Sequence, residues 1–472
     1  MANREKALAK NTLIISFGTF LPKMSSIITL PILTAYLTTA EYGTYDLITT
    51  LVSLFLPIVT LQIQSAAFRF LIDCRKDEQE IKRVITNIFV FIIPVSIVSL
   101  IILYFVLASL STEIKVLICL YFFFDILTLT AQQIVRGLAN NKLYSISAIV
   151  QSFVNMFFVV LMVAIGKRGL EGVPFSIIIA TFISLLLLIG VGKIKKYVDF
   201  KFISRAVLKE LLNYSWPMIP NSLSSWVLRI SDRMVITAFL GIEANAIYAV
   251  ANKIPSLFST VQSTFVFAWQ ENASIVSKDK DADTYYSNMF DSIFCILVGI
   301  MALLIGSTPI LFFLLIRGSY ADAYYQMPIL FLGMLYSSVS SFMGGIYVAH
   351  KKTKSVGITT TIAAIINFAI DLLFVNVIGV YAGSISTLAA YLFLTIYRMF
   401  DVRKFQAIRY RWEKFVLLNV GLVIMCAFCW INISITNILN FILGIVLAVI
   451  VNKNIIRALL RMINEKIHSR YI

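Results

Sequence analysis

The stretch ILTAYLTTAEYGTYDLITTLVSLF at residues 32–55 has a counterpart, VITAFLGIEANAIYAVANKIPSLF, at residues 235–258. A shift of 203 positions aligns the two without a gap and makes seven of 24 positions identical. Each copy contains an apolar run, a short polar loop and a second apolar run. A match of this kind at a fixed shift predicts a chain built from two related halves.

Both copies belong to a chain that is apolar almost throughout. Of its 472 residues, 59% are hydrophobic and only 14% are charged, whereas a soluble domain carries about 25% charged residues. Runs of 18 or more apolar residues are each long enough to cross a hydrocarbon layer of about 30 Å. We therefore predict an all-α polytopic membrane protein of about 14 transmembrane helices. They are expected at residues 12–36, 43–67, 84–108, 114–135, 144–166, 172–192, 212–240, 244–270, 287–316, 324–349, 356–378, 380–399, 414–432 and 435–452.

The first of these runs follows a charged segment, Met1–Lys10. It is too long for the core of a signal peptide and no small-residue cleavage pattern ends it. We expect a retained first helix.

The distribution of lysine and arginine tests this helix count. With the N-terminus inside, 32 of the 40 residues lie in cytoplasmic segments, four in external loops and four within helices. Cytoplasmic loops of membrane proteins carry such an excess. Both termini are therefore predicted to be cytoplasmic. The net charge of +16 then reflects topology and contact with anionic inner-leaflet lipid, and nucleic acid is not an expected partner.

The repeat pairs the first two helices with the seventh and eighth. Six helices separate the two starts, so both halves have the same orientation in the membrane, as in parallel-repeat transporters. We expect two pseudo-symmetric six-helix lobes, residues 1–192 and 212–400, joined by a cytoplasmic linker at 193–211. Residues 401–472 add two extra helices and a basic cytoplasmic tail.

Two segments resemble a known family. FGTFLPKMSSIITLPILTAYLTTAEYGTYDL at 17–47 and YSWPMIPNSLSSWVLRISDRMVITAFLGIEANAIYAVANKI at 214–254 resemble the polysaccharide-exporting branch of the multidrug/oligosaccharidyl-lipid/polysaccharide flippase superfamily. The resemblance implies MATE-like lobes around a cavity lined mainly by helices 1, 2, 7 and 8. It also implies a flippase of the bacterial cytoplasmic membrane. By alternating access, such a protein moves an undecaprenyl-diphosphate-linked oligosaccharide from the inner to the outer leaflet. Capsule, O-antigen and teichoic acid all remain open as products, and association with a glycan polymerase is a further expectation.

Six ionisable residues fall on those four helices. Intramembrane charges are rare and usually face a cavity, because each costs roughly 2.5–3.5 kcal/mol on insertion scales. They carry a formal excess of two positive charges, which suits a lipid diphosphate, since arginine donates two parallel hydrogen bonds to phosphate. The alternative is that Asp232 pairs with Arg229 or Arg233 and only fixes the helix. The predicted diphosphate site comprises Lys23, Asp46, Arg229, Asp232, Arg233 and Lys253.

Further polar residues lie within the apolar runs. Asp125 and Asp371 are candidates for coupling to H⁺ or Na⁺, or are carboxyls held neutral by burial. Others offer hydrogen bonding or stacking to a glycan, although single polar residues on membrane helices more often bind neighbouring helices. The candidate glycan contacts are Asn221, Ser225, Trp226, Gln262 and Trp269.

Two rival functions remain. An ion-coupled multidrug antiporter of the same superfamily is expected to have an acidic or neutral cavity, which the positive excess disfavours. A membrane glycan-modifying enzyme lacks support, because the only histidines are His350 and His468 and no glycine-rich nucleotide loop is present. Cys426 and Cys429 form a C-x-x-C within an apolar run, which is typical of packing. No catalytic activity, cofactor or metal is predicted.

Overall fold

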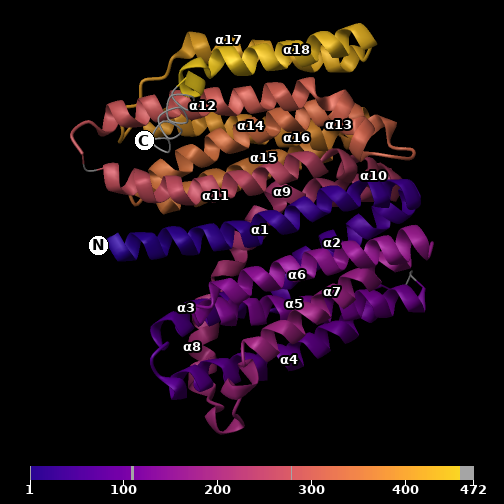
Figure 1. Ribbon diagram of the computed structural model, residues 1–472, viewed down its shortest axis with the longest axis vertical. Helices are drawn as coiled ribbons and strands as arrows, with labels where there is room; N and C mark the ends of the chain where they lie inside the picture. Colours follow the sequence, from indigo (N-terminus) through magenta and orange to yellow (C-terminus); the bar gives the residue numbers. More distant parts are fainter. Residues whose placement is uncertain (1, 108–110, 278, 458–472) are drawn as a thin grey trace, which may run out of the picture. The chain divides into compact units, whose positions relative to one another are not determined.

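The computed structural model describes residues 2–107, 111–277 and 279–457, and the described residues form helices joined by short loops, with no strand (Figure 1). Eleven described helices are long and apolar enough to cross a membrane. Three more have spanning length, namely α1 (Ala2–Tyr36), α9 (Met218–Leu240) and α11 (Lys253–Val276). Helix α9 carries Arg229, Asp232 and Arg233 within five positions, so it is more polar than an ordinary span. Each of these fourteen helices overlaps one of the runs expected from the sequence, and the runs at 43–67, 212–240, 244–270 and 287–316 are each divided into two helices.

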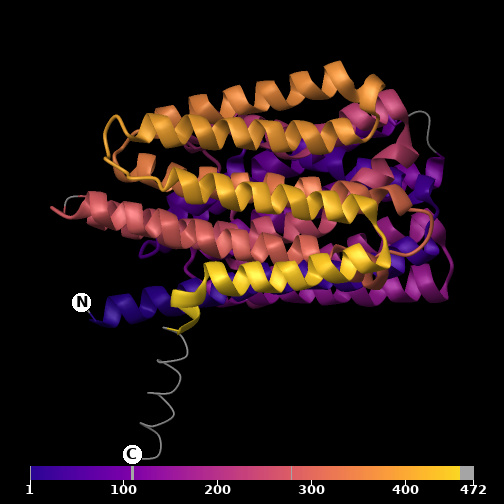
Figure 2. The same cartoon turned by 90° about the horizontal axis from the view of Figure 1, so that it is seen from above.

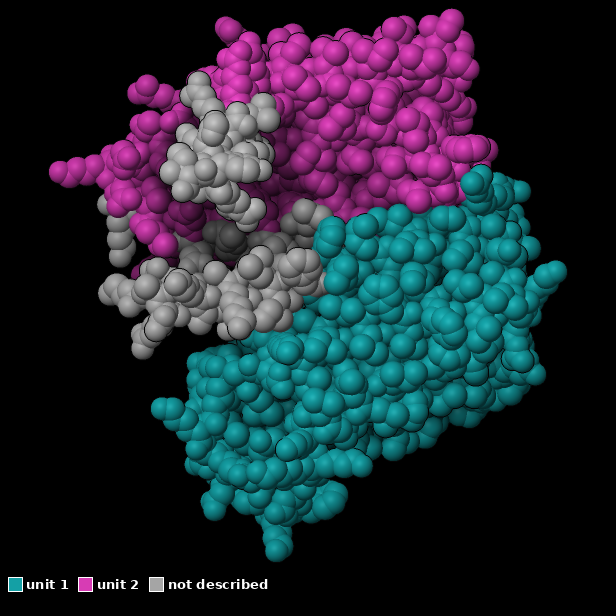
Figure 3. All heavy atoms as spheres, viewed as in Figure 1, with its two compact units in different colours: residues 1–246, 317–319 teal, residues 247–316, 320–472 magenta. Residues whose placement is uncertain are grey.

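The chain divides into two compact units, coloured separately in Figure 3. Unit 1 comprises residues 1–246 and 317–319, and unit 2 comprises residues 247–316 and 320–472. The division falls within α10 (Ile242–Ala251). The lobe boundary predicted at residues 193–211 rests on the sequence repeat, which is a different criterion from compactness, and it stays a prediction.

Unit 1 is a bundle in which α5 contacts α3, α4, α6 and α7, while α2 packs on α7 and α9. Besides α1 and α9, its elements are α2 (Thr39–Val59), α3 (Ile63–Asp73), α4 (Glu78–Val106), α5 (Thr112–Gly137), α6 (Asn141–Val159) with its π-helical continuation η1 (Val160–Ile165), α7 (Gly169–Val191), the 3₁₀ turns η2 (Ile194–Tyr197) and η3 (Phe200–Phe202), and α8 (Arg205–Ser215).

Some predicted helices are divided in the structure. The run expected at 43–67 becomes α2 and α3, because Leu61 and Gln62 adopt positive φ angles of 46° and 56°. Such angles cannot continue a right-handed helix. The run expected at 212–240 becomes α8 and α9, with Pro217 capping α9; proline has no amide hydrogen for a helical hydrogen bond.

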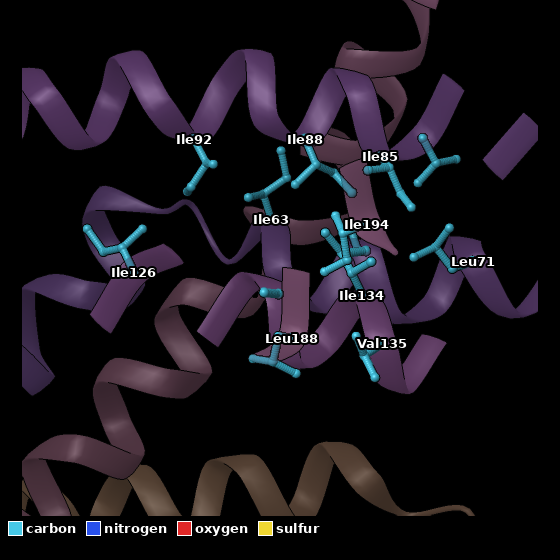
Figure 4. Packing of buried hydrophobic residues seen from close by; sticks show 14 of the residues in the cluster. Ile63, Leu71, Ile85, Ile88, Ile92, Ile126, Ile134, Val135, Leu188 and Ile194 are labelled. Carbon is cyan, nitrogen blue, oxygen red and sulfur yellow. The ribbon is translucent and has the colours of Figure 1, made fainter. Parts of the chain in front are cut away.

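The core of unit 1 is built from branched aliphatic side chains. Ile85, Ile88 and Ile92 project from one face of α4 toward Ile63 and other buried residues (Figure 4). Their spacing of three and four residues places them on one helical stripe. Between spanning helices the stabilisation comes from close van der Waals packing and not from removal from water, and through such packing this cluster fixes α4 against α3 and α5.

Unit 2 is centred on α14, most of whose residues are buried. Helix α14 contacts α11, α12, α15 and α16, and the hairpin of α17 and α18 packs on α12 (Figure 2). Besides α11, its elements are α12 (Ala282–Gly306), α13 (Thr308–Leu315), α14 (Ala321–Ala349), α15 (Thr353–Ile378), α16 (Tyr381–Val402), α17 (Trp412–Ile431) and α18 (Ser434–Val451).

Candidate functional site

The central ion pair of unit 1 joins α9 to α2. The guanidinium of Arg233 donates to Asp46 across 2.6 Å, with 19% and 8% of the two side chains exposed. The side-chain amide of Asn245 donates to the other oxygen of Asp46 at 3.3 Å. Because a buried carboxylate needs several donors, this network joins α9 and α2 at Asp46.

Local sequence explains why α2 presents Asp46 there. The hydroxyl of Thr38 and the carboxylate of Glu41 form a capping box that starts the helix. Gly43 then allows close approach, since a Cβ at this position would lie 2.1 Å from the carbonyl oxygen of Ile242. A larger residue at position 43 would push α2 away from the start of α10, and Asp46 with it.

Two further cations accompany this pair. Arg229 lies one turn before Arg233 on α9, is exposed, and donates its Nε–H to the carbonyl of Ser225 on its own helix at 3.1 Å. Lys23 on α1 is also exposed, and the charges acting on it are those of Arg229 and Arg233. Like charges on spanning helices repel one another unless an anion joins them. Lys23 and Arg229 therefore form the accessible part of the cationic cluster.

The remaining members of the predicted diphosphate site lie elsewhere. Asp232 is only 1% exposed, in contrast to exposed Arg229 three residues earlier. Arg233 forms an ion pair with Asp46 of α2, and the pairing of Asp232 with Arg229 or Arg233 stays a prediction. Lys253 begins α11 and belongs to unit 2. Unit 1 thus brings together Lys23, Asp46, Arg229 and Arg233 from three helices.

Two of the predicted glycan contacts on α9 take part in hydrogen bonds within unit 1. The indole N–H of Trp226 donates to the hydroxyl of Ser53 on α2 at 2.9 Å, and Trp226 is only 8% exposed. Ser225 contributes the carbonyl that accepts from Arg229. The side chain of Asn221 lies outside the described residues. These contacts support α9, and a role toward a glycan stays a prediction.

In unit 2, the two predicted contacts on α11 bind α14. Gln262 donates to the carbonyl of Ser337 at 3.3 Å. Trp269 donates to the carbonyl of Phe342 at 2.9 Å and stacks on its ring at 4.2 Å between centroids. Both side chains are buried. The geometry favours the interhelical alternative, and contact with a glycan remains a prediction for both.

Asp125 faces a polar pocket inside unit 1. Helices α2, α5 and α6 line a partly open space of about 660 Å³. The pocket is lined by Thr49, Val52, Ser53, Leu56, Tyr121, Asp125, Thr128, Leu129, Gln132 and Gln151. Polar side chains predominate, which is unusual between helices that cross a membrane.

Asp371 occupies a different environment, deep within unit 2. It lies on α15 and is 1% exposed. One turn earlier, Asn367 donates to the hydroxyl of Ser386 on α16 at 3.1 Å, and Ser384 donates to Gln326 of α14 at 3.0 Å. Carboxylate, amide and hydroxyl oxygens thus occur among the buried residues of α14, α15 and α16. Such oxygens suit a proton or a hard cation.

Sequence reasoning missed several polar residues that are buried or line the pocket. Arg398 on α16 is 4% exposed and donates to two backbone carbonyls and two threonine hydroxyls. Because Arg398 lies one turn before the end of α16, its place in the sequence resembles that of a loop residue. Tyr121, Thr128 and Gln132 were also missed, although their spacing around Asp125 places all four on one stripe of α5.

The fold resembles that of several solved membrane proteins. The chain superposes on the lipid II flippase MurJ in an inward-closed conformation with a TM-score of 0.72 and 16% identity, covering 95% of this chain and 100% of that one. Superposition on an inward-facing multidrug-resistance MATE transporter gives a TM-score of 0.64 and 13% identity, covering 81% of this chain and 98% of that one. Superposition on a transporter from Pyrococcus furiosus whose binding pocket has reversed polarity gives a TM-score of 0.57 and 13% identity. The match covers 85% of this chain and 96% of that one. These similarities establish a MurJ- and MATE-like membrane fold.

The sequence places the chain in a family. Residues 8–270 match the family described as polysaccharide biosynthesis protein, and the chain belongs to this family. No curated protein matches its sequence.

Proposed function

We propose that this protein is a flippase for a lipid-linked oligosaccharide repeat unit. The cargo is an undecaprenyl-diphosphate-linked oligosaccharide, moved by alternating access from the inner to the outer leaflet of the bacterial cytoplasmic membrane for export of a surface polysaccharide. The observation that carries the proposal is the cationic cluster of Lys23, Arg229 and Arg233 in unit 1. The family and the MurJ-like fold support it.

The cluster suits a diphosphate for a chemical reason. Arg233 is held by Asp46, which orients its guanidinium, while Arg229 and Lys23 are exposed. A guanidinium forms paired hydrogen bonds to phosphate and an ammonium adds a point charge. Binding an anion there removes the repulsion among the three cations. Lys253 of unit 2 is proposed as a further contact.

Ion coupling is proposed at a buried carboxylate. Asp371 is the stronger candidate, because it is buried and lies one helical turn from Asn367, whose amide bonds a hydroxyl of α16. Asp125 is the second candidate, and it faces a much larger space. Protonation or Na⁺ binding at either position would supply energy for returning the carrier to its inward-facing state.

The cluster also separates this proposal from its rivals. A multidrug antiporter that takes cationic compounds would bring them toward three cations, which electrostatics opposes. For a glycan-modifying enzyme, the described residues hold no group of three or more histidines, cysteines or carboxylates that could hold a metal. We therefore propose a transporter without catalytic activity. Its partners are the lipid-linked oligosaccharide, membrane lipid, H⁺ or Na⁺, and a glycan polymerase.

Deletion of the gene tests the proposed function. We expect loss of surface glycan together with accumulation of the lipid-linked precursor in the inner leaflet, both restored by the wild-type gene. Unchanged glycan with new sensitivity to cationic drugs would instead establish the antiporter function. Neighbouring genes for glycosyltransferases and a polymerase would agree with glycan export.

A further inference from the structure

The pocket between α2, α5 and α6 holds polar groups that the protein itself leaves available. Asp125 makes no hydrogen bond or ion pair with another described residue, and the hydroxyl of Tyr121 lies within electrostatic range of its carboxylate. Gln132 and Gln151 share one amide contact at 3.5 Å, which leaves an oxygen of the first and an N–H₂ of the second for a ligand. We propose that this pocket is a saccharide subsite that binds a sugar unit of the transported lipid-linked oligosaccharide.

The composition of the pocket selects the class of ligand. The described residues that line it include no lysine or arginine, so they do not complement a phosphate. A carboxylate accepts two hydroxyl hydrogens, and a primary amide both donates and accepts. Neighbouring hydroxyls of a sugar ring present that mixture of donors and acceptors. The pocket therefore complements a neutral polyol better than it does an anion.

The extent of the polar surface distinguishes a sugar from a bound ion. On α5 the stripe runs from Tyr121 to Gln132, a separation of about 16 Å along the helix axis. A cation gathers its oxygen ligands within about 2.6 Å of itself. Groups spread over the length of the stripe, around a volume of about 660 Å³, match a ligand with many hydroxyls.

Helix α2 connects this pocket to the cationic cluster. Asp46, which binds Arg233, is followed on one face by Thr49 and Ser53, both of which line the pocket. Asp46 and Ser53 are separated by about 10 Å along the axis. Ser53 also accepts the hydrogen bond from Trp226 of α9. A diphosphate at the cluster would thus have its attached glycan within reach of the pocket.

The inference rests on the proposed function, and a paired binding measurement separates the two. The purified full-length protein is offered two lipids in detergent, undecaprenyl diphosphate and the lipid-linked oligosaccharide extracted from the deletion strain. Native mass spectrometry gives both affinities. We expect the wild type to bind the glycan-bearing lipid about tenfold more tightly, the effect of one or two well-formed hydrogen bonds.

Variants then assign that preference to the pocket. Gln132→Leu and Asp125→Asn should reduce the ratio of the two affinities toward one while leaving the affinity for undecaprenyl diphosphate unchanged. Thr130→Val is the matched control, because Thr130 lies on the same helix but bonds the carbonyl of Ile126. Elution as a single species and unchanged helical circular dichroism show that each variant folds.

Each outcome has one meaning. If the wild type binds neither lipid, the proposed function fails. If it binds both equally, or if Gln132→Leu and Asp125→Asn keep the full preference, the saccharide subsite is disproved and the proposed function stands. An Asp125→Asn protein that keeps the preference and loses only a dependence on Na⁺ or pH would show that Asp125 binds an ion instead of a sugar.

Discussion

Arg398 in unit 2 and Asp125 in unit 1 are both ionisable residues on spanning helices, and their surroundings are opposite. Arg398 donates to carbonyls and hydroxyls of α14 and α15, so the protein satisfies it completely. Asp125 faces a pocket and bonds to no other described residue. A buried charged side chain whose hydrogen bonds are made within the protein has a structural role. One without such partners is available to a ligand.

The same contrast exists within the cationic cluster. Arg233 is paired with Asp46 and largely buried, and Arg229 is exposed with one bond to its own helix. The first arginine positions α9 against α2, and the second offers its remaining donors. Pairing by the protein thus orients one arginine of the proposed diphosphate site and leaves the other, one helical turn away, exposed.

The largest effect is expected from removing both arginines. The double variant Arg229→Gln/Arg233→Gln should lower glycan export at least about hundredfold, because two charge-assisted hydrogen bonds to phosphate contribute about 1.5–3 kcal/mol each. Surface glycan is measured in a complemented deletion strain at matched protein levels. Arg403→Gln, at an exposed position, is the control. Normal export by the double variant would show that the cluster is structural.

A large loss of stability is expected at Arg398. Replacement with methionine leaves the carbonyl of Ser340 and the hydroxyl of Thr359 without their donor, which should cost about 2–4 kcal/mol. Thermal unfolding in detergent measures this loss, with Arg403→Met as the exposed control. Equal melting temperatures for the two variants would contradict the structural role assigned to Arg398.

A smaller loss is expected at Gly43. The methyl group of alanine would meet the carbonyl oxygen of Ile242, and the overpacking should cost about 1–3 kcal/mol. Gly190→Ala is the matched control, because a Cβ there has no described heavy atom within 4 Å. Thermal unfolding of the two variants should differ clearly. A neutral Gly43→Ala would show that α2 does not depend on this close approach.

The smallest change in stability is expected at Asp125. Asp125→Asn should leave the melting temperature unchanged or raise it, because no described ion pair is lost. Asp46→Asn removes the partner of Arg233 and should cost about 1–3 kcal/mol. Comparing the two variants tests the contrast between open and paired carboxylates directly. A marked destabilisation by Asp125→Asn would show that Asp125, like Asp46, has a structural role.

The sequence was sufficient to predict where most of the helices lie, and the diphosphate site stays a prediction. Apolar length identified fourteen runs, and the spacing of Arg229 and Arg233 placed them on one face. Burial and pairing could not be predicted, because they depend on residues distant in the chain. Arg233 pairs with Asp46 187 positions away, and Trp269 stacks on Phe342 of another helix. The polar pocket was missed because its members come from three helices, although the stripe on α5 was visible as a pattern.

Transbilayer movement in reconstituted liposomes tests the central claim most directly. The lipid-linked oligosaccharide from the deletion strain is placed in vesicles containing the protein, and its accessibility to membrane-impermeant periodate is followed over time. We expect the wild-type protein to expose the inner-leaflet glycan and the Arg229→Gln/Arg233→Gln protein to leave it protected. Equal exposure by both proteins, or none by the wild type, would contradict a flippase that holds its diphosphate on these arginines.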